Sequence, residues 1–358
     1  MQEAVQDYIN DKEIIEKILK LKEEWGEKLL ILTHHYQRKE IVELGDCRGD
    51  SFGLSQKAAS DKDARFIVFC GVHFMAESAE ILSQPHQIVQ IPAFEAGCPM
   101  ADMADIYIVE RAWKEITSIV REDVIMPIVY MNSDAHIKAF CGRYGGAVCT
   151  SSNAQTAFSW GFDQREKIFF FPDQHLGRNT GNQMGILPEE MIVWNSGESF
   201  GGNTSEKIKK AKLILWDGYC HVHTRFRAEH VLKMRKKFPE AGIVVHPECT
   251  QEVIKLADAV GSTSFIVKYV EDAPPNATII IGTEINLINR LAMENPHKNI
   301  LELHYSLCPN MFKINLGNLL LSLESIGQLN VVKVPENIKS ESKTALDNML
   351  ALNTYATS

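Results

Sequence analysis

The chain has 358 residues and a formal net charge of −9, with 37 Lys and Arg against 46 Asp and Glu. An acidic chain without a block of basic residues lacks the positive surface on which nucleic-acid binding depends. It has no apolar stretch near the roughly 18 residues that span a membrane, and its charged first residues lack the apolar segment of a signal peptide. We therefore expect a cytoplasmic protein without nucleic-acid or membrane partners, whose eight cysteines stay reduced.

The first predicted element is an amphipathic helix within residues 1–28, which has isoleucines and leucines along one side. After it, short apolar runs alternate with helical stretches, which is typical of βα units in a mainly parallel sheet. The apolar runs are LLILTHHYQ, FIVFCGVHF, PIVYMNS, KIFFFPD, GIVVHPE and TIIIGTE. The sequence thus predicts an α/β fold.

Three segments of the chain repeat one order of elements. Each opens with a strand whose end is polar, at His34, Asn132 and His246. A Ser-bearing turn follows 17, 19 and 16 residues later, at Ser51, Ser151 and Ser262. After a second strand and helix, a third strand runs into a lone cysteine, 64, 88 and 62 residues beyond the first strand end, at Cys98, Cys220 and Cys308. We attribute the longer middle repeat to a polar surface loop near 195–212.

The three cysteines predict a metal centre. Ligands gather beyond the carboxyl ends of parallel strands, so three such units around a pseudo-threefold axis would bring the cysteines together. Zinc would need a fourth protein ligand, such as His221 or His223. Three cysteines on a 4Fe-4S cluster would instead leave one iron open as a Lewis acid. The other five cysteines share no equivalent position and are interpreted as core or surface thiols: Cys47, Cys70, Cys141, Cys149 and Cys249.

Polar residues at the strand ends and turns predict a site for an anionic substrate. Apolar strands that end in His, Tyr and Glu are hard to explain by packing alone. The polar residues are His34, His35, Tyr36, Tyr130, Asn132, His246 and Glu248. The hydroxyl-rich turns GDS, TSSNA and GSTS fit helix starts, where hydroxyls and free N–H groups bind phosphate or carboxylate. Each feature alone could be a capped helix or a satisfied core side chain.

Taken together, these residues resemble the quinolinate synthase family over essentially the whole chain. The resemblance rests on the ordered motifs HHYQ, GDS, FCGVHFMAESAEIL, AGCPMADM, YMNS, CTSSNA, PDQHLG, GYCHVH, HPEC, GSTS, GTE and CPNM. Two positions depart from the family's usual pattern, His35 (often Asn) and Met131 (often Val). Neither position carries a predicted chemical role.

The resemblance implies an enzyme that condenses iminoaspartate with dihydroxyacetone phosphate to quinolinate, phosphate and water in de novo NAD synthesis. It implies three similar three-layer αβα domains with parallel sheets around a pseudo-threefold axis. The domains would span residues 1–120, 121–240 and 241–335, and a C-terminal helix within 336–358 would pack back on the body. A 4Fe-4S cluster would be held by Cys98, Cys220 and Cys308, which favours the cluster over zinc.

The resemblance also implies roles for individual residues. Acid–base chemistry would fall to Tyr36, Tyr130 and Glu248, with Glu248 as general base, and His223 would lie close to the open iron. The carboxylates and the phosphate would be held by His34, Ser51, Asn132, Ser151, His246, Ser262 and Thr263. An L-aspartate-oxidising enzyme would supply iminoaspartate through a transient contact.

Three other functions fit part of the pattern. The first is another hydro-lyase with an open iron, which acts on a small carboxylate. The second is a non-catalytic cluster protein that senses iron or oxygen, and the third is a structural zinc protein. Product analysis separates the first from quinolinate synthesis, turnover excludes the second, and metal analysis decides the third.

Overall fold

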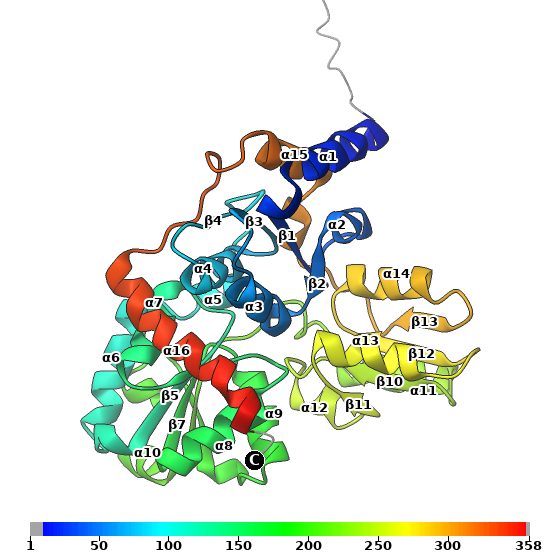
Figure 1. Cartoon of the computed structure of the whole chain (residues 1–358). Helices are drawn as coiled ribbons and strands as arrows, with labels where there is room; N and C mark the ends of the chain where they lie inside the picture. Colours follow the sequence, from blue (N-terminus) through cyan, green and yellow to red (C-terminus); the bar gives the residue numbers. More distant parts are fainter. Residues whose placement is uncertain (1–9, 356–358) are drawn as a thin grey trace, which may run out of the picture.

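The computed structural model describes residues 10–355, which form three parallel sheets with helices packed on their faces (Figure 1). The strands of the first sheet, in spatial order, are β2 (Cys47–Gly49), β1 (Leu29–His34), β3 (Phe66–Cys70) and β4 (Ile88–Gln90). Its helices are α1 (Asp11–Trp25), α2 (Lys39–Leu44), α3 (Ser51–Ser60), α4 (His73–Leu82) and α5 (Pro99–Asp102). Helix α6 (Ile106–Thr117) follows and packs on the second unit, where the ring of Trp113 meets that of Phe140.

The second sheet has five strands, in the order β6 (Ala147–Cys149), β5 (Ile125–Tyr130), β7 (Lys167–Phe171), β9 (Leu213–Trp216) and β8 (Met191–Trp194). Its helices are α7 (Ala135–Arg143), α8 (Ala154–Gln164), α9 (Gln174–Gln183) and α10 (Ser205–Lys210), and α11 (Ala228–Lys237) follows. The expected loop at 195–212 contains the 3-10 helix η4 (Ser199–Gly202) and α10. The extra chain of the middle repeat therefore adds folded structure, and β8 just before it supplies the fifth strand.

The third sheet runs β11 (Ala259–Val260), β10 (Gly242–Val245), β12 (Thr278–Gly282) and β13 (Asn299–Glu302), with helices α12 (Gln251–Ile254), α13 (Thr263–Asp272) and α14 (Ile285–Glu294). Two helices follow, α15 (Leu316–Glu324) and α16 (Glu336–Tyr355). The remaining 3-10 turns are η1 (Gly26–Lys28), η2 (Glu122–Val124), η3 (Pro188–Glu190) and η5 (Met311–Lys313). Of the described helices, none combines the length and apolar character needed to cross a membrane.

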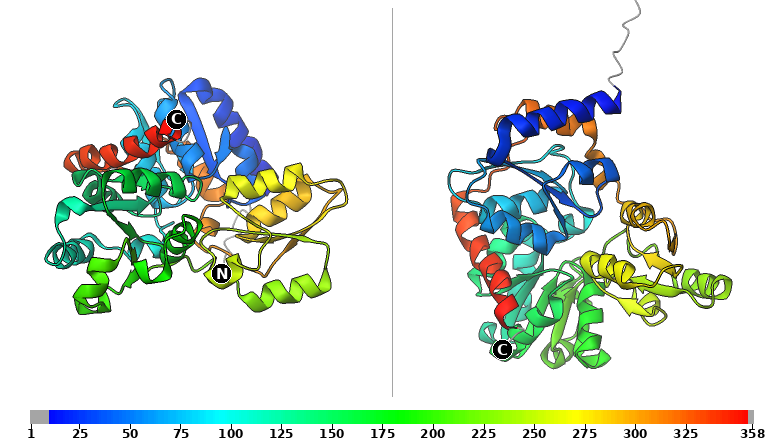
Figure 2. Two further views of the ribbon diagram at one scale, coloured as in Figure 1. Left: turned by 90° about the horizontal axis from the view of Figure 1, so that it is seen from below. Right: turned by 45° about the vertical axis from the view of Figure 1, so that its right-hand side comes forward.

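Equivalent backbone hydrogen bonds relate the three units. The third residue after the second long strand donates its N–H to a carbonyl that lies two residues before the repeat's cysteine. These bonds join His73 to Ala96 at 2.8 Å, Gln174 to Gly218 at 2.9 Å, and Ile285 to Ser306 at 2.9 Å. Seen from below, the units surround a common centre (Figure 2). The prediction of three similar α/β units around a pseudo-threefold axis is confirmed.

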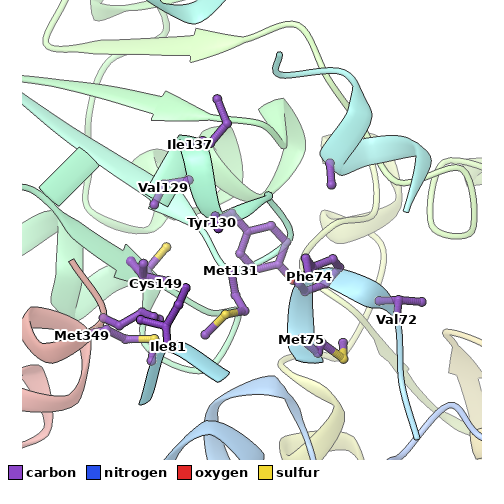
Figure 3. Close-up of a cluster of buried hydrophobic side chains, with 14 of the residues drawn as sticks. Val72, Phe74, Met75, Ile81, Val129, Tyr130, Met131, Ile137, Cys149 and Met349 are labelled. Atoms are coloured by element: carbon purple, nitrogen blue, oxygen red, sulfur yellow. The ribbon is translucent and has the colours of Figure 1, made fainter. Parts of the chain in front are cut away.

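Continuous apolar strands explain why each unit has helices on both faces. All six residues of β1 and of β5 are buried, as expected for parallel strands covered on both sides. One hydrophobic cluster joins the first and second sheets and includes residues of α15 and α16. Figure 3 shows part of it, where Ile81, Met131, Cys149 and Met349 come together from separate elements. The third sheet has two clusters of its own, one on each face.

The C-terminal part of the chain ties the first two units together. Beyond the third sheet the chain returns to the first, where α15 packs on α1 and Val331 forms an antiparallel bridge with Gln90. Helix α16 then lies along α7 and also contacts α4, α8 and β6. Part of the range 241–335 thus packs with the first unit, and the expected domain bounds stay a prediction.

Gly142 permits the close contact between α7 and α16. A Cβ atom at this position would lie 1.9 Å from the carbonyl oxygen of Glu341. We therefore expect Gly142→Ala to separate the two helices and to lower the free energy of unfolding by about 1–3 kcal/mol. Urea denaturation measures this change. Gly53→Ala in α3 is the matched control, since its methyl group would meet only an Asp50 oxygen at 3.5 Å. Equal stability of both variants would contradict the packing argument.

Candidate active site

A cavity lies where the three units meet. The predicted site residues that line it are His34, Tyr36, Ser51, Cys98, Tyr130, Asn132, Ser151, Cys220, His223, His246, Glu248, Thr263 and Cys308. Ser262 does not line it, because its Oγ caps α13 and accepts the Phe265 N–H at 3.3 Å. Among the lining residues of the described structure there is no lysine or arginine.

The central strand of each unit points its carboxyl end at this cavity. His34 is the last residue of β1 and Tyr130 the last of β5, while His246 directly follows β10. Parallel strands collect their C-terminal residues at one edge of a sheet, where open α/β proteins place their ligands. Three sheets with this edge turned inward therefore surround one volume with polar side chains.

Glu248 is the centre of a buried hydrogen-bond network. The hydroxyl of Tyr130 donates to its Oε1, and its Oε2 lies 2.7 Å from Nδ1 of His223. On the other side of the imidazole, Nε2 lies 3.1 Å from Oγ1 of Thr283, which is 2.7 Å from the hydroxyl of Tyr36. Residues of all three units thus form one chain of proton donors and acceptors. Such a chain can move a proton between its ends without admitting water.

The protonation states follow from burial and from these bonds. Burial alone would raise the pKa of Glu248, but the neighbouring imidazoles and the bonds from His223 and Tyr130 lower it overall. Burial raises the pKa of both Tyr36 and Tyr130 well above 10.0. It lowers the pKa of His34 to about 4 and that of His246 to about 3. At neutral pH the site therefore holds an ionised carboxylate, neutral tyrosines and neutral imidazoles at 34 and 246.

Cys98, Cys220 and Cys308 reach the cavity from the three repeats. Burial raises the pKa of each thiol, to about 12 for Cys98. Backbone N–H groups two or three residues further along the chain act in the opposite sense and favour each thiolate. A cation at this point would complete the stabilisation, because metal ligation needs the deprotonated sulfur.

The spacing of the metal-ligating atoms separates two kinds of metal site. In the described residues, the donors found within 4.8 Å of one another are those of Cys220, His223 and Glu248. The three cysteine sulfurs do not form such a set, although ligands about 2.3 Å from a single zinc ion would lie closer together than this. In this structure the three sulfurs therefore do not meet around one point as the ligands of a single ion would.

Two residues of the site lay outside the sequence prediction. Thr283 joins Tyr36 to His223, and Asp50 accepts hydrogen bonds from Ser152 and Ser264. Both lie in motifs that the sequence analysis singled out, GTE and GDS. These motifs could have drawn attention to the two residues, but their hydrogen-bond partners come from other units. Sequence spacing carries no information about such contacts.

A buried carboxylate, two tyrosines and several imidazoles around one cavity are the groups of an acid–base enzyme. Comparison with known proteins gives the family. The family model described as quinolinate synthetase A protein matches residues 16–351. The quinolinate synthase of Corynebacterium glutamicum is 44% identical over 96% of this chain and 88% of that protein. That of Bacillus cereus is 45% identical over 96% of this chain and 94% of that protein. That of Halalkalibacterium halodurans is 46% identical over 94% of this chain and 93% of that protein. The chain belongs to the quinolinate synthase family, and the resemblance seen in the sequence is confirmed.

His35, the neighbour of His34, makes the stability of the folded protein depend on pH. Its Nδ1 lies 3.1 Å from Nη2 of Arg290, and since a guanidinium only donates, this nitrogen must stay unprotonated. Burial, followed by the charges of His34 and Arg290, lowers the pKa of His35 from 6.5 to about 3. Between these values the unfolded chain binds the proton and the folded chain does not. Stability is therefore lost as the pH falls below 6.5.

We expect His35→Asn to remove this contribution. The amide oxygen of Asn can accept from Arg290 but does not titrate. The loss of unfolding free energy between pH 7.5 and pH 5 should be smaller in the variant by about 2 kcal/mol. Urea denaturation of both proteins at the two pH values measures the difference. The same pH dependence in both would mean that His35 is not held neutral.

Proposed function

We propose that the protein is a quinolinate synthase, which condenses iminoaspartate with dihydroxyacetone phosphate to quinolinate, phosphate and water in de novo NAD synthesis. The observation that carries the proposal is the joint lining of one cavity by three repeat-related cysteines and the Tyr130–Glu248–His223 network. Membership of the family supports the choice of reaction. We further propose a cytoplasmic location and a transient contact with an L-aspartate-oxidising enzyme that supplies iminoaspartate.

We propose that Cys98, Cys220 and Cys308 hold a 4Fe-4S cluster. The donor set suits it, since thiolates are the usual ligands of such clusters and N–H groups near the sulfurs tune them. The three sulfurs do not all lie within 4.8 Å of one another, which supports a cluster over a single ion. When bound, the cluster would supply an open iron that acts as a Lewis acid on the hydroxyl lost as water.

The chain's own side chains would divide the remaining work. Glu248, ionised and buried, would be the group that accepts a proton, and His223, 2.7 Å away, would orient it by donating its Nδ1–H. Tyr36 and Tyr130 keep their protons and would donate them. The hydroxyls and amide that would bind the substrate's carboxylates and phosphate belong to Ser51, Asn132, Ser151 and Thr263, with the neutral imidazoles of His34 and His246 beside them. Ser262 would contribute by holding the start of α13.

A single zinc ion on Cys220, His223 and Glu248 is the second candidate, because these donors lie within 4.8 Å of one another. That ion would have to break the bond between His223 and Glu248. Metal analysis of matched variants separates the two sites. We expect about four iron and four sulfide per anaerobically purified chain, lost in Cys98→Ala, Cys220→Ala and Cys308→Ala.

Two further variants make this measurement decisive. Cys249→Ala is the control, since this buried thiol belongs to the third unit's core, and it should keep the cluster. His223→Gln should also keep the iron. A chain that binds zinc, loses it in His223→Gln and keeps it in Cys98→Ala would reject the cluster and support the single-ion site.

Glu248→Gln tests the acid–base assignment. The amide keeps the shape of the side chain but cannot take up a proton, so kcat should fall by about 10²–10⁴-fold. The absorption spectrum of the cluster should not change. Glu240→Gln, at an exposed position, controls for loss of charge and should leave turnover as in the wild type. If Glu248→Gln lost the cluster itself, the residue would be a structural or ligating group and not the base.

A further inference from the structure

One carboxylate joins the Ser-bearing turns of all three units. Asp50 caps α3 in the first unit, where its Oδ1 accepts the N–H of Gly53 at 2.9 Å. Its Oδ2 accepts from Oγ of Ser152 in the second unit at 2.7 Å. The same oxygen accepts from Oγ of Ser264 in the third unit at 2.9 Å. The side chain is nearly buried, with 8% of its surface exposed.

The turns bring polar residues of all three units to the cavity and also bond to one another. Ser51, Ser151 and Thr263 line the cavity, and so does Asp50. Ser152 and Ser264, the chain neighbours of Ser151 and Thr263, both donate to Asp50. Because neighbouring residues share a peptide unit, fixing these two donors also fixes where the hydroxyls of their chain neighbours point.

An anion in this cavity would have to be bound mainly by these hydroxyls. No lysine or arginine lines the described cavity, so an anion there depends on short, well-aimed hydrogen bonds. Asp50 takes up the protons of Ser152 and Ser264, and it stays ionised because the bonds from Gly53 and the two serines lower its pKa despite burial. The cavity-facing hydroxyls remain free to donate.

The two interdomain bonds of Asp50 differ in what else supports them. The first and second units share one hydrophobic cluster, and α16 packs against helices of both. Their relative position is therefore fixed without Ser152. The third unit has separate clusters, and polar bonds such as His35–Arg290 and Arg48–Glu294 join it to the first. The hydrogen bond between Asp50 and Ser264 therefore joins two units that share fewer apolar contacts.

We propose that Asp50 is a positioning residue that holds the third unit's turn through Ser264, so that Thr263 binds the same anion as Ser51 and Ser151. The inference rests on the proposed function in one respect, that this cavity takes a phosphate or carboxylate. It adds a residue of the cavity wall that acts on the anion site through Ser264, and it predicts that the two interdomain bonds are unequal.

Inorganic phosphate is the probe, measured by isothermal titration calorimetry without turnover. Asp50→Asn keeps the helix cap, for which Asn and Asp are equally suited, and weakens the acceptor for both serines. We expect the Kd for phosphate to rise about tenfold in Asp50→Asn and in Ser264→Ala, as for the loss of one hydrogen bond. Ser152→Ala should raise it less than threefold, and Ser264→Thr, which keeps a hydroxyl, should restore binding.

The double variant Asp50→Asn/Ser264→Ala tests whether the two residues act together. If Asp50 works through Ser264, the double variant should bind phosphate about as well as either single variant. Additive losses, equal effects of Ser152→Ala and Ser264→Ala, or no phosphate binding by the wild type would overturn the proposal. In steady-state kinetics the single variants should raise KM for dihydroxyacetone phosphate more than they lower kcat.

The two proposals fail in different ways. If the iron-loaded wild type binds phosphate but forms no quinolinate, the proposed function is wrong and the positioning role of Asp50 stands. If quinolinate forms and the Kd for phosphate is the same in every variant, the proposed function stands and the positioning role of Asp50 is wrong.

Discussion

The parallel direction of the strands is the constraint on which the centre of this protein depends. Each unit buries its strands on both faces and can present polar side chains only at strand ends and in the turns beyond them. The three sheets turn these edges toward one another, so His34, Tyr130 and His246 meet although they are far apart in the chain. A reversal of any central strand would place its polar end at the outer surface.

Burying an ionised carboxylate at this meeting point has a large cost unless its oxygens are bonded. Glu248 meets that condition because it accepts one bond from Tyr130 and one from His223, and Thr283 and Tyr36 continue the network. The residues come from different units, so the network forms only when all three are assembled. The buried charge and the assembly of the units therefore depend on the same bonds, and a change at Glu248 affects both.

Burial also has a cost for the three cysteines, whose thiols must ionise before they can bind a metal. The three thiols resist ionisation, because burial raises the pKa of each. The nearby N–H groups reduce this cost only in part, which leaves a site suited to a strongly bound cationic group. In each repeat the cysteine lies two residues beyond the carbonyl that accepts the equivalent backbone hydrogen bond. These bonds therefore hold the three cysteines in equivalent positions.

The sequence by itself determined the α/β class, the threefold repeat and the set of polar residues at strand ends. These features follow from local periodicity and from spacing within each repeat. It did not distinguish Ser262, which caps α13, from Thr263, which lines the cavity, because adjacent residues of a turn differ only in direction. Nor did it indicate the partners of Thr283 and Asp50, which lie in other units. Only the tertiary structure decided which side chains bond across the centre, because contacts between units depend on how three separately formed sheets pack.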